Sequence, residues 1–243
     1  MLTKSISFIL SVVCLIGCSI APPGTDIHDP FEQNNRQVHA FNKAIATQFG
    51  GNDDAPSGPR IPEAVSLPVI NAAENISLPG VIVNNLLQAD VDGAATNTVR
   101  FLVNSTVGVL GLFDPADAIG LTEVDTDFGG TLAVWGAPEG AYLELPFLGP
   151  KTERDAAGDI VDLFLDPLGP LLTDEEALAA TVVGIAGQVA KVDQSGDLIG
   201  DVLSESADSY VQTRLIYMQN RRFELGQDAS AVDPYEELFG EFE

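Results

Sequence analysis

The spacing of apolar residues along the chain predicts a protein made mainly of helices. Near the N-terminus, apolar residues recur at steps of seven, three, four and four: Phe31, Val38, Phe41, Ile45 and Phe49. This spacing is typical of one face of an α-helix. Asp29 can cap that helix and Pro30 suits its first position, while Gly50 and Gly51 end it.

The middle of the chain is interrupted by helix-breaking residues and by two strand-like stretches. Pro68 and Pro79 divide residues 63–90, which predicts two or three short helices there. Residues 131–135 and 142–145 are rich in β-forming side chains and have turn residues between them. We expect extended segments or a small hairpin from these two stretches.

A capping box at Thr173 and Glu176 predicts the start of a helix whose residues 177–190 are almost wholly apolar. Fourteen helical residues rise about 21 Å, less than the ~30 Å thickness of a bilayer's hydrocarbon core. Two interpretations remain open: a helix buried in a protein core, or a helix lying within one leaflet.

The last long helix is expected from about Asp208 to Leu225, with Gly226 as its stop. Tyr210, Arg214 and Tyr217 fall on one of its faces, at steps of four and three. Residues 227–243 follow as an acidic tail, which we expect to be mobile.

The N-terminus has the pattern of a lipoprotein signal peptide. Lys4 precedes an apolar run over residues 6–16, and the run ends at the small Gly17 before Cys18. We therefore expect residues 1–17 to be removed, Cys18 to be lipidated and residues 18–28 to form a tether. The alternative is an ordinary signal peptide with incidental cysteines.

Charge and composition exclude several classes of function. With 11 basic and 36 acidic residues, the net charge of −25 disfavours nucleic acid. Two cysteines and two histidines make a structural zinc site, an iron–sulfur cluster or a disulfide framework improbable. No nucleophile elbow, P-loop or dinucleotide fingerprint is present, so we expect no enzyme, no catalytic residue, no metal and no cofactor.

Several blocks, in the same order, resemble the MlaA/VacJ family of outer-membrane phospholipid-transport lipoproteins. They are Asp29-Pro30-Phe31-Glu32, Val83-Asn84-Asn85-Leu86-Leu87-Gln88, Asp127-Phe128-Gly129, Tyr142-Leu143-Glu144-Leu145-Pro146-Phe147-Leu148-Gly149-Pro150, and Tyr210 with Arg214, Tyr217 and Arg222. The resemblance covers roughly residues 29–226. Ala89 and Ser209 depart from it, because the family usually has glycine and proline there.

The resemblance implies a mainly α fold: a compact ring-like bundle of amphipathic helices in one membrane leaflet, with at most a small extended hairpin and no spanning segment. Residues 29–226 would form this domain, held by its lipid anchor in the periplasmic leaflet of the outer membrane.

The implied function is to remove phospholipids from the outer leaflet through an amphipathic channel and pass them to a periplasmic carrier. This maintains the lipid asymmetry of the outer membrane. A porin trimer and the carrier would be protein partners, and nucleic acid would not. Tyr210, Arg214 and Tyr217 would meet the headgroup, unless they pack and pair internally. A scaffold lipoprotein that binds porin and a lipid hydrolase are the competing classes.

Overall fold

Residues 27–50, 61–194 and 207–227 are described by the computed structural model, and the chain divides into two compact units. Unit 1 comprises Met1–Pro56, Gly136–Ala157 and Asp197–Glu243. Unit 2 comprises Ser57–Trp135 and Gly158–Gly196. The predicted domain over residues 29–226 therefore contains two units. The signal peptide, Cys18 and the tail from residue 228 lie outside the described residues.

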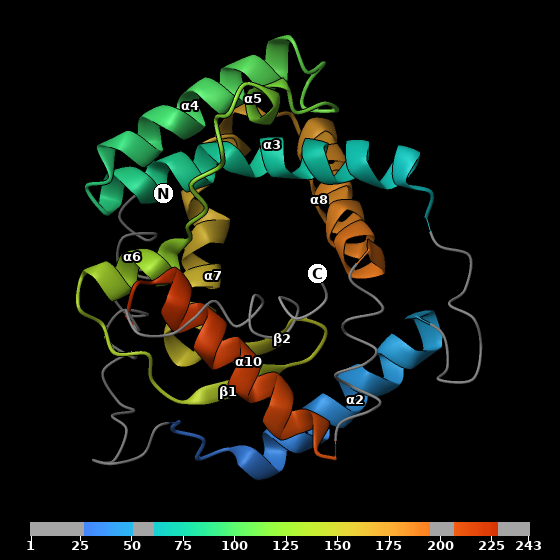
Figure 1. Ribbon diagram of the computed structural model, residues 1–243, viewed down its shortest axis with the longest axis vertical. Coiled ribbons are helices and arrows are strands. Elements are labelled where there is room, and N and C mark those ends of the chain that lie inside the picture. The colour runs from blue at the N-terminus through green and yellow to red at the C-terminus, as the bar shows by residue number, and fades with distance from the viewer. Residues whose placement is uncertain (1–26, 51–60, 195–206, 228–243) are drawn as a thin grey trace, which may run out of the picture. The chain divides into compact units, whose positions relative to one another are not determined.

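Unit 1 is built on helices α2 (Glu32–Gly50) and α10 (Ser209–Glu224) and on a β-hairpin (Figure 1). Strands β1 (Tyr142–Leu145) and β2 (Gly149–Thr152) pair antiparallel, with Tyr142 opposite Thr152. The core of unit 1 is small: Tyr142, Tyr210 and Met218 are buried, and Ile27 and Tyr217 pack against them. The predicted helices at both ends of this unit, and the strand at 142–145, are confirmed.

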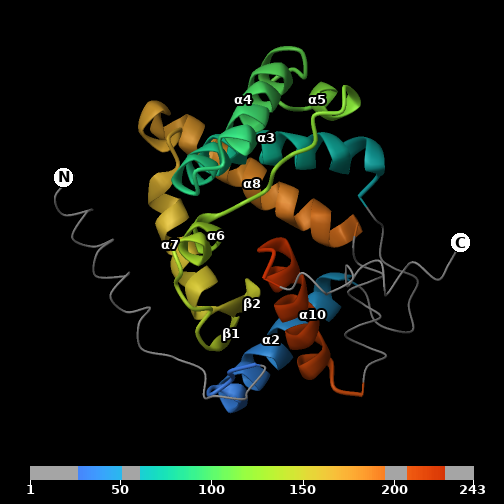
Figure 2. The same cartoon turned by 60° about the vertical axis from the view of Figure 1, so that its left-hand side comes forward.

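Unit 2 holds α3 (Glu63–Leu87), α4 (Val91–Thr106), α5 (Pro115–Ala118), α6 (Phe128–Val134), η2 (Gly169–Leu171) and α8 (Asp174–Gln194). Helix α7 (Glu153–Leu165) begins in unit 1 and continues into unit 2. Helix α3 packs against both α4 and α8, as Figures 1 and 2 show. The contact with α8 is close, because a Cβ added at Gly187 would lie 2.4 Å from Cβ of Ala73.

The prediction of two or three short helices over residues 63–90 is wrong, since α3 is one helix of 25 residues with Pro68 and Pro79 inside it. A proline costs a helix about 3 kcal/mol through its missing N–H and its ring. Burial of Pro79 and packing of α3 between two helices offset this cost. The proline signal is local, whereas the packing depends on distant segments.

As one unbroken helix, α3 bears on the expectation that the chain has no spanning segment. Among the described residues, α3 alone is long and apolar enough to cross a membrane by length and composition. Only 33% of its most apolar stretch is buried. Core helices of soluble proteins pass the same test, so its contacts with α4 and α8 matter more than its length.

Residues 131–135 are also not extended, because most of them belong to α6. Asp127 caps this helix by accepting a hydrogen bond of 2.6 Å from the Gly130 amide. Thr131, a β-branched residue that suggested a strand, is fully buried and donates to Asn84. The strand that pairs with residues 142–145 is β2 instead.

Several helix boundaries follow the predicted chemistry. The Glu176 carboxylate accepts from the Thr173 amide at 2.9 Å, and the Glu176 amide donates back to Oγ1 of Thr173. Asp208 caps α10, which ends before Gly226 in a left-handed conformation. Asp29 is the exception: α2 begins only at Glu32, and the Asp29 carboxylate binds side chains instead.

Candidate functional site

Asp29 is the first of three buried carboxylates that organise unit 1. It accepts hydrogen bonds from Asn35 at 2.9 Å, from Arg214 at 2.5 Å and from the Tyr210 hydroxyl. Guanidinium carbons of Arg36 and Arg214 lie 4.5 and 5.4 Å from the centroid of the Tyr210 ring. The first turn of α10 is thereby tied to the segment before α2.

Asp155, at the start of α7, is the second carboxylate. It accepts from Tyr217 at 2.6 Å, from Thr152 at 2.7 Å and from Arg221 at 3.0 Å. Burial alone would raise the pKa of Asp155, but Arg221 and the hydroxyl donors outweigh burial and lower that pKa. Asp155 is therefore an ionised anchor for the last turns of α10.

Glu144, on β1, is the third carboxylate. The Tyr142 hydroxyl donates to it at 2.5 Å, and burial together with this hydrogen bond raises the pKa of Tyr142. His39 Nδ1 lies 3.3 Å from Glu144, and His39 Nε2 lies 3.1 Å from Oγ of Ser209. His39 thus links α2, β1 and α10.

The predicted face of α10 exists, and its members contact two different carboxylates. Tyr210 and Arg214 contact Asp29, whereas Tyr217 contacts Asp155. These contacts are the internal pairing that the sequence left as an alternative. Arg214 is only partly engaged, because its buried Nε has no hydrogen-bond partner among the described residues.

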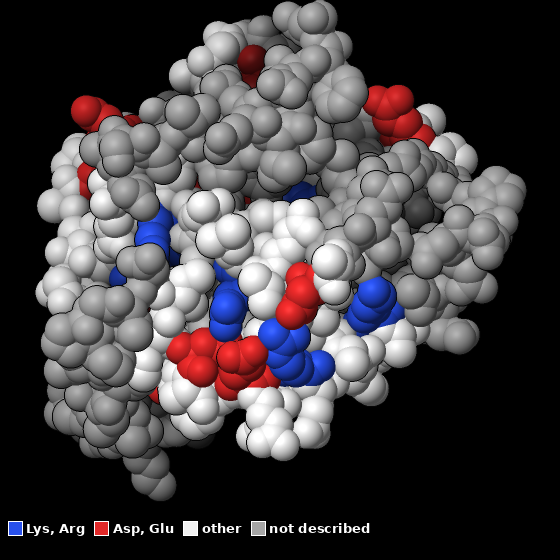
Figure 3. All heavy atoms as spheres, turned by 60° about the horizontal axis from the view of Figure 1, so that its bottom comes forward, with Lys and Arg blue, Asp and Glu red and all other residues white. Residues whose placement is uncertain are grey.

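Of the three carboxylates, only Asp29 was singled out from the sequence, and as a helix cap. Each of the three lies in a block quoted for the family resemblance or just behind one. A charged residue in a sequence block does not reveal which distant arginine or tyrosine it meets. Figure 3 shows blue and red side chains side by side on the face turned to the viewer. The ion pairs of Arg36 with Glu32 and Asp208 are exposed examples from unit 1.

Unit 2 has a polar interior of a different kind, made largely of amides. Asn97 donates to Asn85 and to the Val124 carbonyl, both at 2.8 Å, and accepts from the Val124 amide. Asn84 donates to Asp162 at 2.8 Å and accepts from Thr131. These side chains are almost completely buried and join α3 to α4, α6 and α7.

The exterior of unit 2 is strongly apolar. Exposed residues on α8 recur at steps of four, three and four: Leu178, Val182, Ile185 and Val189. The opposite face of this helix, with Gly187 and Ala190, is buried. Most of the exposed large apolar side chains described in the whole chain belong to unit 2. An exposed apolar stripe such as that of α8 is typical of a surface that contacts another protein or a membrane.

No cluster of three or more metal-binding side chains occurs within residues 27–50, 61–194 and 207–227. No site for a cofactor or metal is therefore assigned there.

The described residues form a mainly helical protein whose unit 2 combines buried amides with an exposed apolar face. The chain belongs to the MlaA lipoprotein family, whose model matches residues 27–224.

Individual relatives agree with this membership. The intermembrane phospholipid transport system lipoprotein MlaA of Escherichia coli is 30% identical over 221 residues, covering 88% of this chain and 85% of the relative. The protein of that name from Haemophilus influenzae is 27% identical, covering 98% of this chain and 96% of the relative.

The fold agrees as well. A structure solved in work on the structural basis for maintenance of bacterial outer membrane lipid asymmetry matches with a TM-score of 0.60 and 27% identity. The match covers 81% of this chain and 98% of that one.

Proposed function

We propose that this chain is a lipid-anchored outer-membrane protein that removes phospholipids from the outer leaflet and passes them to a periplasmic carrier. The names of its relatives supply the transport system and the phospholipid cargo. The transfer needs no covalent chemistry, because it moves a lipid between two lipid environments.

The observation that carries the proposal is the distribution of side chains in unit 2, with polar groups inside and apolar groups outside. In hydrocarbon, backbone and polar side chains must find partners inside the protein, while apolar side chains face outward. Unit 2 has both properties, with Asn84 and Asn97 satisfied inside and the apolar face of α8 outside. This supports residence of unit 2 within one leaflet.

Cys18 supplies the proposed anchor, with its acyl chains in the periplasmic leaflet. Each buried methylene contributes about 0.8 kcal/mol, so two or three acyl chains hold a protein firmly. Cys18→Ala should leave an unprocessed precursor that takes up no labelled fatty acid. Normal acyl labelling of this variant would contradict the assignment.

Arg214, between Tyr210 and Tyr217 on α10, is the proposed headgroup contact. Arginine suits a phosphate because its donors form a planar fork. The unpartnered Nε of Arg214 supports this role, whereas its bond to Asp29 supports a structural one. Arg214→Lys keeps the positive charge but loses the planar, two-pronged set of N–H donors of the guanidinium group. It should therefore raise surface phospholipid without lowering protein abundance, whereas a purely structural arginine would show reduced abundance.

The central test is the outer-leaflet phospholipid content of a strain that lacks the gene. It should rise on deletion and return to normal on complementation. The proposed partners, a porin trimer and a periplasmic carrier, follow from the family resemblance. Cross-linking from the complementing protein should capture both, and a scaffold would capture porin without changing surface phospholipid.

A second candidate function, ester hydrolysis, is favoured by one arrangement in unit 1. Glu144, His39 and Ser209 have the distances of an acid, a base and a nucleophile. Two features oppose it: His39 is only 6% exposed, and the Asp208 carboxylate caps the amides at the start of α10. An oxyanion would compete with that carboxylate. Labelling of wild type, but not of Ser209→Ala, by a fluorophosphonate would establish a reactive serine, and release of free fatty acid from phospholipid that is lost in Ser209→Ala would establish hydrolysis.

A further inference from the structure

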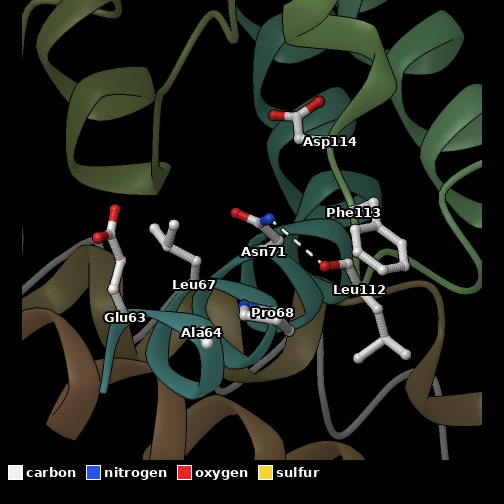
Figure 4. A pocket seen from close by; sticks show the side chains of 8 residues that line it. All are labelled: Glu63, Ala64, Leu67, Pro68, Asn71, Leu112, Phe113 and Asp114. Atoms are coloured by element: carbon white, nitrogen blue, oxygen red, sulfur yellow. Dashed lines mark hydrogen bonds between the residues drawn. The ribbon is translucent and has the colours of Figure 1, made fainter. Parts of the chain in front are cut away.

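A groove runs between the first turns of α3 and the segment that leads into α5. Its volume is about 380 Å³, and all of its lining residues belong to unit 2. Leu67 and Pro68 contribute from α3, and Leu112 and Phe113 from the opposite side (Figure 4). The lining is mainly apolar.

The wall of the groove that Leu112 and Phe113 form belongs to a loop, and backbone hydrogen bonds hold this loop in place. Val109 and Leu110 have positive φ angles of 55° and 58°, a left-handed conformation that strains a non-glycine residue. Hydrogen bonds hold this backbone, from Leu110 to Ser105 at 3.0 Å and from Phe113 to Gly108 at 2.9 Å. These hydrogen bonds support this wall of the groove without contacts from a ligand.

The strained residues of this loop are also apolar and exposed. Glycine or asparagine would fit a left-handed turn in water at lower cost. Here Val109 and Leu110 display apolar side chains that are 54% and 77% exposed. An apolar medium next to the groove gives these side chains a favourable environment.

The charged groups of the groove are both carboxylates. Asp114 is engaged, with Arg100 at 2.7 Å and Asn104 at 2.9 Å. Glu63 stands at the other end, beyond Leu67, and forms no ion pair within the part of the chain that the structure describes (Figure 4). A lone carboxylate repels an anionic group and attracts an ammonium.

We propose that this groove holds one acyl chain of a phospholipid whose headgroup carries an ammonium, with that ammonium at Glu63. The proposal rests on the proposed function, because it takes phospholipid as the cargo. It adds a binding site distinct from the α10 face, together with a preference for a class of headgroup.

The occupant can be identified by photo-cross-linking from the groove. The full lipoprotein, purified in detergent with its retained lipid, would carry benzoylphenylalanine in place of Leu112 or, as a control, of Val189 on the outer face of α8. Phospholipid adducts are expected at position 112, and detergent adducts at position 189. Detergent alone at position 112, equal phospholipid adducts at both positions, or a cross-link to the lipidated N-terminal peptide would each overturn the proposal.

A bulky side chain placed in the groove by mutation provides an independent measurement. Ala64 lines the groove and is exposed, so Ala64→Trp should fill the groove without disturbing the core. Ala95 on α4 is a matched exposed alanine elsewhere in unit 2. Native mass spectrometry should show at least fivefold less retained phospholipid for Ala64→Trp and no change for Ala95→Trp. Equal retention by both variants, each with the wild-type helical content, would overturn the proposal.

The headgroup preference is tested with nanodiscs of equimolar phosphatidylethanolamine and phosphatidylglycerol. An exposed carboxylate–ammonium pair is worth about 0.2–1 kcal/mol, so adducts at position 112 should favour phosphatidylethanolamine up to about fivefold. Glu63→Gln should bring the ratio near one, while Asp92→Asn, in the first turn of α4, should not. An unchanged ratio in Glu63→Gln would overturn the assignment of Glu63.

These results are independent of the cellular test. Deletion of the gene can leave surface phospholipid unchanged while the purified protein still retains a lipid in this groove. Equally, transport can be normal while position 112 meets only detergent.

Discussion

Unit 1 buries carboxylates and surrounds each with an arginine, a tyrosine or a histidine, whereas unit 2 buries amides beneath an exterior of leucine, valine and phenylalanine. Burying an ion costs several kcal/mol unless it is paired, and burying an amide costs much less. The two units therefore solve the same problem of polar burial mainly by different means. Unit 1 relies on ion pairs, whereas unit 2 relies on amides together with the pair of Arg100 and Asp114.

The distribution of basic residues makes the same distinction. Arg36, Arg154, Arg214, Arg221 and Arg222 all belong to unit 1, whereas the described basic residues of unit 2 are Arg100 and Lys191. Both of these form ion pairs within unit 2, with Asp114 and Glu74. Among its described residues, unit 2 therefore has little positive charge to attract anionic headgroups, and its proposed association with lipid would depend on apolar contact.

The largest expected effect comes from breaking a buried ion pair in unit 1. Asp155→Asn removes the charge that Arg221 and Arg154 face. Arg221 keeps its ion pair with Glu224, but Arg154 is only 2% exposed and has no other ion pair among the described residues. An uncompensated buried charge costs about 3–5 kcal/mol of unfolding free energy. Urea unfolding in detergent measures this loss.

Asp208→Asn is the matched control for that change. It breaks an arginine pair whose side chains are 39% and 44% exposed, and it keeps the helix cap. We expect a loss of at most about 1 kcal/mol. Equal losses for the two variants would mean that burial does not distinguish these ion pairs.

A charge on the outer face of unit 2 should act on the membrane rather than on folding. Val182→Glu on α8 places a carboxylate in the apolar stripe, which costs up to about 3 kcal/mol in hydrocarbon. For a protein expressed from residue 19, without its acyl anchor, vesicle flotation should show partitioning roughly 100-fold weaker. Gln188→Glu, on an exposed polar position of the same helix, should float like wild type.

The pH dependence should differ between the units. Burial, together with Asp125 and Glu74, raises the pKa of Glu123 in unit 2 to about 7, although Arg100 opposes this. The folded state then binds more protons than the unfolded state between about pH 4.5 and 7, so Glu123 lowers stability as pH rises through that window. The lowered pKa of Asp155 has the opposite sign, and its contribution is lost only in acid.

This difference is measured by the melting temperature between pH 5.5 and 8. Glu123→Gln should flatten the fall in melting temperature that wild type shows as pH rises. Asp155→Asn should lower the melting temperature at both pH values and leave the slope unchanged. A wild-type slope in Glu123→Gln would show that Glu123 does not titrate in this range.

The smallest expected effect concerns Ala89, which departs from the glycine that the resemblance implies. Its φ angle is 61°, a left-handed conformation in which alanine is strained by about 1–2 kcal/mol. Ala89→Gly relieves this strain but adds unfolded-state entropy, for a net gain of up to about 1 kcal/mol. Ala95→Gly, on an exposed turn of α4, should instead lose about 0.5–1 kcal/mol. Thermal unfolding distinguishes the two signs.

Local patterns predicted much of the helical structure, because their causes are local. The capping box at Thr173, the cap at Asp208 and the stop at Gly226 each depend on neighbours within a few residues. The unbroken α3 could not be predicted, because its prolines are offset by contacts with helices far along the chain.

The candidate site shows the same limit. Helical spacing placed Tyr210, Arg214 and Tyr217 on one face of α10. It could not show that they meet Asp29 and Asp155, which lie 62 to 185 residues away in the sequence. Asparagines such as Asn97 resembled ordinary polar positions, because burial of an amide depends on the donors and acceptors that other helices bring to it.

The hydrogen bond of 2.8 Å from the Tyr142 amide to the His28 carbonyl has a geometric consequence. It fastens the chain to unit 1 at the last residue of the proposed tether, so Cys18 and His28 are joined by nine intervening residues, or ten Cα–Cα steps. A fully extended chain covers at most about 3.3–3.6 Å per residue, so Cys18 and His28 lie at most about 33–36 Å apart. If Cys18 is acylated as proposed, its lipid anchor can therefore sit no farther than roughly one hydrocarbon thickness from His28 on unit 1.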